Sequence, residues 1–283
     1  MLTSYVKAAV PLIPGASRLP FVAGGGGELP DRELERELTP DADRLAAYAR
    51  VCAFTLRGTL PATYPHVLAF PLHMELMTAG DFPFAAMGLV HLRNRIEQRR
   101  PIAIGETLGL RVRVADLEPH PKGRTFSILT EARVGEQLVW NGVSTILHRG
   151  GGSGERDGRD EEASAPEGVA QWRLPGDLGR RYASVSGDRN PIHLHPLTAR
   201  ALGFPRAIAH GMWTKARGLA ALESRLPDAY AVDVRFRRPI LLPSTVAFGS
   251  EQDGRRIRFA VRAVRGEDRH LDGAVEPLGS KRS

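Results

Sequence analysis

The sequence predicts an α+β protein built from two copies of one unit, in each of which a helix packs against an antiparallel sheet. The first observation is a repeat. Tyr48-Ala-Arg-Val matches Tyr182-Ala-Ser-Val at an offset of 134 residues, and Arg99-Arg-Pro-Ile recurs as Arg237-Arg-Pro-Ile at an offset of 138. The second observation is strand-like alternation of apolar and polar residues in both halves. The third is a series of apolar residues at helical spacing in the second half.

A change in composition separates the two copies. Residues 150–168 are rich in glycine, serine and charged residues and show no apolar periodicity, which is typical of a flexible linker. We therefore divide the chain into an N-terminal unit at 1–149, a linker at 150–168 and a C-terminal unit at 169–283.

A buried helix is predicted in each unit. In the C-terminal unit, Pro227 ends a series of apolar residues that recur at spacings of three and four: Met212, Ala216, Leu219, Leu222 and Leu226. In the N-terminal unit the best candidate is the segment from Phe70 to Met77.

Strands with one buried and one exposed face are predicted in both units. In the N-terminal unit, residues 110–114 alternate apolar residues with arginine, and residues 138–147 indicate a further strand. In the C-terminal unit the alternating apolar residues are Val232, Val234 and Phe236, followed by Ile257, Phe259, Val261 and Ala263. Such alternation favours antiparallel pairing.

Composition narrows the class of protein. The single cysteine, Cys52, cannot form an intramolecular disulfide, so we expect a reducing, cytoplasmic compartment. No apolar run approaches the roughly 18 to 20 residues that span a bilayer. Residues 1–20 are expected to be an N-terminal arm, not a signal peptide.

The charge of the chain favours an anionic partner. The formal net charge is +7 and the isoelectric point is near 10.0. Nucleic acid is not expected, because the arginines are spread through the alternating segments and no zinc-finger spacing or aromatic RNA-binding motif is present. Charge alone does not choose among the other anionic partners.

One short bend brings together a carboxylate, an amide and an imidazole, in Gly187-Asp-Arg-Asn-Pro-Ile-His193. Glycine and proline are turn residues, and Asp188 and Asn190 are of the types that bond their own backbone in tight turns. A rigid bend of this kind can direct the acid Asp188 and the base His193 at one water molecule. An ordinary Asx turn beside an exposed histidine has the same residue pattern.

This bend, with Tyr182 upstream and Ala199 downstream, resembles the signature loop of the MaoC-like hydratases. These are (R)-specific enoyl-CoA hydratases and (R)-3-hydroxyacyl-thioester dehydratases of the hotdog fold. The segment from Phe204 to Met212 resembles the second motif of that family, in which a glycine opens the central helix. The whole chain is similar to double-hotdog dehydratases of bacterial lipid metabolism. The resemblance implies two hotdog units and reversible hydration of enoyl thioesters in fatty-acid metabolism, carried on coenzyme A or acyl carrier protein.

The resemblance also implies a role for each site residue. His193 activates the water, Asp188 shares that water and delivers or holds the proton for Cα, and Asn190 orients the pair. The N–H of Gly211, at a helix N-terminus, is expected to donate to the thioester oxygen. No metal and no cofactor are expected. A hotdog acyl thioesterase and a non-catalytic acyl-thioester binding module stay open as alternatives, and so does a homodimer.

Comparison of the two copies predicts that only the second is catalytic. The offset of 134 places Phe54 opposite Asp188 and Thr59 opposite His193. The N-terminal unit therefore lacks both the acid and the base. We expect it to be a scaffold that covers the sheet and shapes an acyl pocket.

A third match, between Tyr64-Pro and Phe204-Pro at an offset of 140, places Phe70-Pro71 opposite His210-Gly211. Because proline has no N–H, this alignment predicts that the N-terminal unit also lacks the backbone donor. Outside the motif, His195 and His210 are expected to be structural, with His210 capping or packing at the helix start. Trp213 is expected in the core, and His73 and His91 lack the spacing of a metal site.

Overall fold

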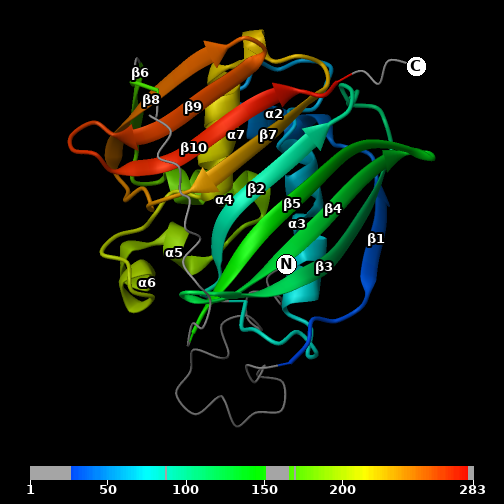
Figure 1. Cartoon of the computed structure of the whole chain (residues 1–283), viewed down its shortest axis with the longest axis horizontal. Coiled ribbons are helices and arrows are strands. Elements are labelled where there is room, and N and C mark those ends of the chain that lie inside the picture. Colours follow the sequence, from blue (N-terminus) through cyan, green and yellow to red (C-terminus); the bar gives the residue numbers. More distant parts are fainter. Residues whose placement is uncertain (1–26, 87, 151–165, 169, 280–283) are drawn as a thin grey trace.

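The fold is one antiparallel sheet of ten strands, in the order β1-β3-β4-β5-β2-β7-β10-β9-β8-β6 (Figure 1). The structure, a computed structural model, describes residues 27–86, 88–150, 166–168 and 170–279. The predicted N-terminal arm and most of the predicted linker lie outside these residues. The strands are β1 (Glu33–Leu38), β2 (Val90–Gln98), β3 (Leu108–His120), β4 (Gly123–Val134), β5 (Gln137–Arg149), β6 (Ala170–Leu174), β7 (Tyr230–Phe236), β8 (Ser244–Asp253), β9 (Arg256–Ala263) and β10 (Arg269–Pro277).

The strand order is symmetric about the middle of the sheet. Read inward from either edge, each half contributes its first, third, fourth, fifth and second strand in turn. Each half therefore repeats the topology of the other, and the halves meet where β2 pairs with β7. The predicted α+β, double-hotdog fold is confirmed.

The seam between β2 and β7 agrees with the sequence repeat. Arg95 lies opposite Asp233, and Asn94 and Ile96 lie opposite Val234 and Val232. Residues 95 and 233 are 138 positions apart, the same offset as the repeated Arg-Arg-Pro-Ile. A pseudo-twofold axis therefore passes through the Arg95–Asp233 pair, and the offset of 138 is confirmed.

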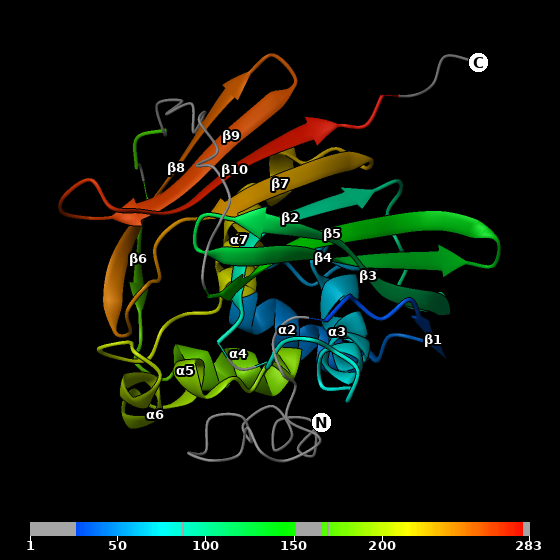
Figure 2. The ribbon, with the colours of Figure 1, turned by 60° about the horizontal axis from the view of Figure 1, so that its bottom comes forward.

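The helices lie together on one side of the sheet (Figure 2). The central helices are α3 and α7, each preceded by a shorter helix that packs at its start. The bounds are α2 (Ala42–Cys52), α3 (Tyr64–Met77), α4 (Leu178–Ser186), α5 (Pro191–Leu194), α6 (Pro196–Ala201), α7 (Gly211–Ala221) and the 3₁₀ turn η3 (Glu223–Arg225).

Both predicted central helices exist, but their bounds differ from the predictions. The segment from Phe70 to Met77 is only the second half of α3, because Tyr64-Pro65 already forms its first turn. Helix α7 was expected to continue to Leu226, but it ends at Ala221. There the N–H of Leu222 bonds the carbonyl of Leu219, and the tighter turn η3 follows.

The helices α2 and α4 superpose the two halves at the offset of 134. Both end in a left-handed residue, Ala53 with φ of 60° and Gly187 with φ of 77°, whose N–H groups bond the carbonyls of Ala49 and Ala183. Phe54 and Asp188 then occupy equivalent positions, as predicted. The match at an offset of 140 is wrong, because Tyr64 begins α3 whereas Phe204 lies in the loop before α7.

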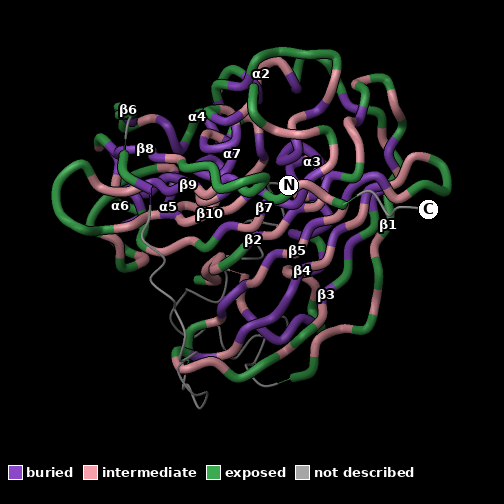
Figure 3. Tube along the Cα trace, turned by 45° about the horizontal axis from the view of Figure 1, so that its top comes forward, coloured by how far each residue is buried: buried purple, intermediate pink, exposed green. Residues whose placement is uncertain are grey.

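The buried residues gather between the sheet and the helices (Figure 3). The alternation predicted from the sequence is confirmed, since Leu110, Val112, Val232, Val234 and Phe259 are all buried. The core also buries a charged group: Lys215 of α7 donates from Nζ to the carbonyls of Asn94 and Val232 and to Asn94 Oδ1. Within the described part of the chain, no helix is long and apolar enough to cross a membrane.

Candidate active site

The predicted bend follows α4 and is held by its own side chains. The N–H of Asn190 donates to Asp188 Oδ1 at 3.1 Å, and the N–H of Ile192 donates to Asn190 Oδ1 at 3.3 Å. The second bond caps the N-terminus of α5. The side chain of Asp188 is 29% exposed, so its carboxylate faces both the interior and solvent.

His193 lies in α5 and is 8% exposed, so the alternative of an exposed histidine beside a plain turn is wrong. Its Nδ1 is 2.8 Å from the carbonyl oxygen of Ile208. A carbonyl can only accept, so Nδ1 carries the proton and Nε2 keeps its lone pair. Burial lowers the pKa of His193, while the charge of Asp188 opposes that shift. The ring is therefore a neutral base near pH 7.

Close packing of two helices fixes the backbone of His193. A Cβ atom on Gly179 of α4 would lie 1.9 Å from the carbonyl oxygen of His193. No side chain fits at that distance, and only glycine permits the contact between α4 and α5. Gly179 was not identified from the sequence, where nothing distinguishes it from other glycines.

His210 lies between the predicted acid and base, and sequence analysis did not assign it there. Its Nε2 donates to the carbonyl oxygen of Asp188 at 3.0 Å and is 3.8 Å from Asp188 Oδ2. Its ring stacks on His193 at 3.6 Å and lies 4.8 Å from the ring of Tyr182. The side chain does not cap α7, although His210 is the N-cap residue. In the sequence, His210 directly precedes Gly211, the residue predicted to open the helix, and that position could have indicated its place in the site.

The electrostatics keep His210 uncharged. Burial lowers its pKa to about 3, helped by neighbouring His193 and opposed by Asp188. With Nε2 donating, Nδ1 is an acceptor that is buried without a hydrogen-bond partner in the described structure. This site therefore contains two neutral imidazoles and one carboxylate.

One ligating atom each from Asp188, His193 and His210 lie within 4.8 Å of one another, which also raises the question of a metal ion. The two imidazole planes are only 26° from parallel and are stacked face to face. Lone pairs lie in the ring planes, so stacked rings direct them side by side and not at one point. The geometry suits acid–base chemistry better than metal ligation.

Gly211 opens α7 beside this triad. As the first helical residue, its N–H has no acceptor within the helix and carries part of the positive end of the helix dipole. A Cβ atom at Gly211 would lie 3.0 Å from the ring of Phe236 on β7. Phe236 in turn lies 4.9 Å from the ring of His91 on β2. The glycine therefore allows close approach of the sheet to the start of α7.

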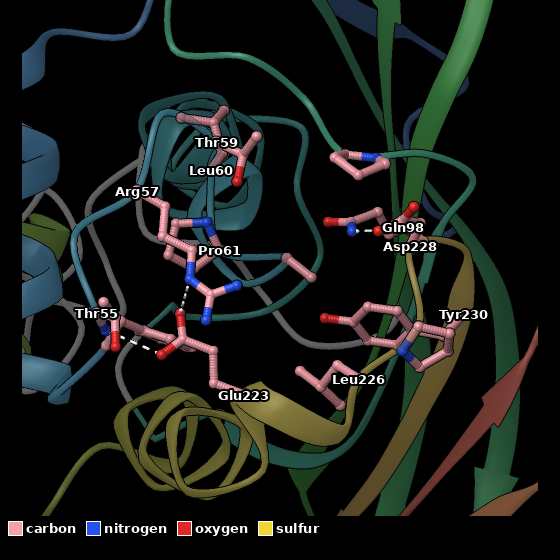
Figure 4. Close-up of a pocket in the computed structure, with 14 residues that line it drawn as sticks. Thr55, Arg57, Thr59, Leu60, Pro61, Gln98, Glu223, Leu226, Asp228 and Tyr230 are labelled. Atoms are coloured by element: carbon pink, nitrogen blue, oxygen red, sulfur yellow. Dashed lines mark hydrogen bonds and ion pairs between the residues drawn. The ribbon is translucent and has the colours of Figure 1, made fainter.

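The equivalent place in the N-terminal half is a separate cavity of about 110 Å³ (Figure 4). Phe54, at the position of Asp188, is among its lining residues. Glu223 binds Arg57 and the N–H of Thr55 on one side, and Gln98 and Tyr230 lie on the other. The prediction that Thr59 stands opposite His193 is wrong, as two backbone bridges show.

Thr59 bridges to Ala103, as Ile208 bridges to Leu241, and residues 103 and 241 are related by the offset of 138. Thr59 is thus the counterpart of Ile208, and His193 has none. Phe70-Pro71 do not stand opposite His210-Gly211 either, since they lie inside α3.

The helix start is also altered in the N-terminal half, although not at the residues predicted. At the start of α3 the N–H of Tyr64 already donates to the carbonyl of Pro61 at 2.8 Å, and Pro65 has no N–H. Neither residue can offer a donor to a ligand.

The remaining polar residues near the motif are structural, as expected. His195 is exposed and accepts from the N–H of Leu197 to cap α6. Trp213 is buried and donates to the carbonyl of Val51, which ties α7 to α2. His73 bonds Thr130 Oγ1 at 2.9 Å, and its ring lies 5.0 Å from that of His66.

Fold and site together define a double-hotdog protein with a carboxylate and two buried imidazoles grouped at a helix N-terminus. The family model of the MaoC like domain matches residues 166–274, the half that carries this centre. The chain is 41% identical to 3-hydroxyacyl-thioester dehydratase X of Mycobacterium tuberculosis, over 89% of this chain and 90% of that protein. The chain belongs to the MaoC-like dehydratase family.

Solved structures agree with this assignment. The crystal structure of HtdX from M. tuberculosis has a TM-score of 0.78 at 39% identity, covering 87% of this chain and 100% of that one. A MaoC-like dehydratase from Phytophthora capsici has a TM-score of 0.74 over 89% of this chain and 97% of its own, at 20% identity. The second likeness shows the fold alone.

Proposed function

We propose that this protein is a hydro-lyase that reversibly hydrates trans-2-enoyl thioesters to (R)-3-hydroxyacyl thioesters. The observation that carries the proposal is the state of His193, whose Nδ1 is held by Ile208 so that Nε2 stays free as a base beside Asp188. The name of the relative in M. tuberculosis, a 3-hydroxyacyl-thioester dehydratase, supports the same reaction.

In the hydration direction, His193 Nε2 accepts a proton from water while the water oxygen bonds to Cβ of the enoyl group. The electrons of the double bond move toward the thioester oxygen, where negative charge develops. The N–H of Gly211 donates to that oxygen and the positive end of α7 stabilises the charge. The Asp188 carboxylate receives that proton from His193 and delivers it to Cα, so the hydroxyl of the water ends on Cβ, its proton ends on Cα, and both side chains return to their starting states. Dehydration reverses each step.

The other assignments follow from the contacts of the loop. Asn190 acts through the backbone, because its cap on α5 fixes the turn between Asp188 and His193. His210 bonds the Asp188 backbone and stacks on His193, so it holds the two groups together. We assign catalysis to the C-terminal unit, 169–283, and a scaffold role to the N-terminal unit, 1–149. The proton transfers described above use only groups of the protein. We place the reaction in fatty-acid metabolism in the cytoplasm.

The test is an absorbance assay with crotonyl-CoA, together with a thiol reagent. Hydration removes the absorbance of the conjugated enoyl thioester and releases no thiol. Release of free thiol would identify a thioesterase instead, and neither signal would indicate a binding module. A series of acyl lengths in the same assay then defines the preferred substrate.

A further inference from the structure

An exposed basic surface lies beside the catalytic loop. Residues 178–210 contain five arginines but only one acidic residue, Asp188, which belongs to the site. All five arginines are exposed, and four of them lie, with one exposed leucine, on α4, α6 and the loop after α6. We call these residues the basic face: Arg180, Arg181, Leu197, Arg200 and Arg206.

Three of the four arginines of the basic face are held in place by carbonyl groups, and none of the four is neutralised by a carboxylate of the described residues. Arg180 donates to the carbonyl of Leu194 at 3.0 Å, Arg200 to that of Pro205 at 3.1 Å and Arg206 to that of Pro243 at 3.3 Å. In the part of the chain that the structure describes, none of these three, nor Arg181, forms an ion pair.

Some arginines of the sheet, by contrast, form ion pairs with carboxylates. Arg111 of β3 bonds two carboxylates, Glu33 and Glu35, and Arg93 of β2 pairs with Asp233. Such pairing cancels charge at the surface. On the basic face, carbonyl acceptors order the guanidinium groups but leave their charge available to a partner.

Leu197 gives this surface an apolar contact point. Its side chain is 66% exposed at the start of α6, four residues after His193. α6 packs against α5, which carries His193, so the basic face adjoins the proposed site. An exposed apolar residue amid cations fits a protein partner better than a small phosphorylated ligand.

We propose that the basic face docks an acidic acyl carrier protein, which presents its acyl thioester to Asp188 and His193. Acidic side chains of the carrier pair with the arginines, and an apolar residue of the carrier packs on Leu197. This inference rests on the proposed function, because a carrier is needed only if the chain acts on acyl thioesters.

The test compares one enoyl group on three carriers: an acyl carrier protein, coenzyme A and pantetheine, which has no phosphate. The variants are Arg181→Glu with Arg200→Glu, and separately Leu197→Asp. The matched control is Arg255→Glu, a charge reversal of an exposed arginine in the turn between β8 and β9.

We expect the paired reversal to lower kcat/KM for the carrier-protein substrate by about 10-fold or more, since steering by charge changes association rates by 10- to 1,000-fold. Leu197→Asp should lower the same quantity. Turnover of the pantetheine and coenzyme A substrates should stay within about twofold, and the control should resemble the wild type. Added salt should lower kcat/KM of the wild type for the carrier-protein substrate. The same salt should have little effect on kcat/KM of the Arg181→Glu, Arg200→Glu variant.

Several outcomes would overturn docking. A loss confined to the coenzyme A substrate would identify a phosphate site, and an equal loss on pantetheine would mean that the variants disturb the catalytic loop. An unchanged kcat/KM for the carrier protein would also reject it. Absence of turnover on all three substrates in the wild type would reject the proposed function itself, which separates the two failures.

Discussion

The N-terminal and C-terminal halves share one frame, yet the contents of their equivalent sites are opposite. Tyr48 and Tyr182 are buried at the same point of α2 and α4. One turn earlier, Leu45 of the first half is buried at the position of Gly179 in the second. At the helix ends, Phe54 replaces Asp188. The first half places apolar side chains where the second places the loop from Asp188 to His193.

The lengths of the connections explain this difference. From the helix end at Gly187 to the helix start at His210, the C-terminal connection is 13 residues longer than that from Ala53 to Thr63. The additional chain forms α5 and α6 and carries His193. A leucine at Gly179 would collide with α5, so the glycine and the longer connection require each other.

The seam shows why the halves are not interchangeable. Lys215 bonds the carbonyls of Asn94 and Val232, which are equivalent under the offset of 138, so its amine lies close to the pseudo-twofold axis. Its third acceptor, Asn94 Oδ1, exists on one side only, since the counterpart is Val232. Two copies of the C-terminal half would set Asp233 against Asp233 and leave Lys215 without that acceptor. The first half thus supplies what the second lacks at this seam.

The largest expected effect comes from removing the pair that the first half lacks. Asp188→Asn and His193→Ala should each lower turnover by about 100- to 10,000-fold, the range for a general acid or base. The double variant should be little worse than either single one, because the two groups act on one water. Steady-state turnover of an enoyl thioester measures this, with Thr59→Ala of the first half as the control. Additive losses would argue against a shared water.

The second effect concerns the helix start, which is open in α7 and blocked in α3. Gly211→Pro removes the N–H and should cost about 2.7 to 4 kcal/mol in the barrier, as does loss of one oxyanion donor elsewhere. Gly211→Ala keeps the N–H but presses on Phe236, so it should cost less. Turnover and a thermal melt are measured for both. A normally folded Gly211→Pro variant with wild-type turnover would show that the donor lies elsewhere.

A third variant tests whether the glycine of α4 makes room for the loop. Gly179→Ala should displace the backbone of His193, and a misplacement of about 1 Å can cost about 100-fold in rate. Ser184→Ala, on the exposed side of the same helix, should have no such effect. The comparison of kcat values is made at temperatures where both variants are folded. Equal activity of the two variants would mean that α5 does not depend on this contact.

The pH dependence should belong to the C-terminal half. Burial lowers the pKa of His193 below its ordinary value of 6.5, and the base must be neutral to act. Activity should therefore be constant near neutral pH and fall only below pH 6.5, as His193 becomes protonated. A profile of kcat/KM against pH measures this, with a melt at each pH as the control. An acid limb with its midpoint above 6.5 would contradict the assignment of a buried base.

The smallest expected effect on activity is that of restoring the acid alone in the first half. Phe54→Asp should produce no second active site, because His193 has no counterpart in the first half and the N–H of Tyr64 is already occupied. In an Asp188→Asn background it should rescue nothing. It should lower the melting temperature, since Phe54 is buried and an unpaired carboxylate there is unfavourable. Recovery of turnover would show that the cavity of the first half is still competent.

The sequence by itself determined the features that depend on neighbours along the chain. The bend from Asp188 to His193 follows from turn residues and side chains that bond their own backbone, and the strands follow from alternation. The repeats at 134 and 138 were readable because equivalent positions in a duplicated fold keep similar side chains. The match at 140 was misleading because a proline after an aromatic residue suits both a helix start and a loop.

Tertiary structure decided everything that joins distant segments. The tautomer of His193 depends on the carbonyl of Ile208, and the place of His210 between acid and base depends on how α7 meets the end of α4. The early end of α7 and the contact of Gly179 are set by packing, as is the register of β2 on β7. Local residue patterns specify backbone conformation over a few residues. Which groups then meet is fixed only when the sheet closes over its helices.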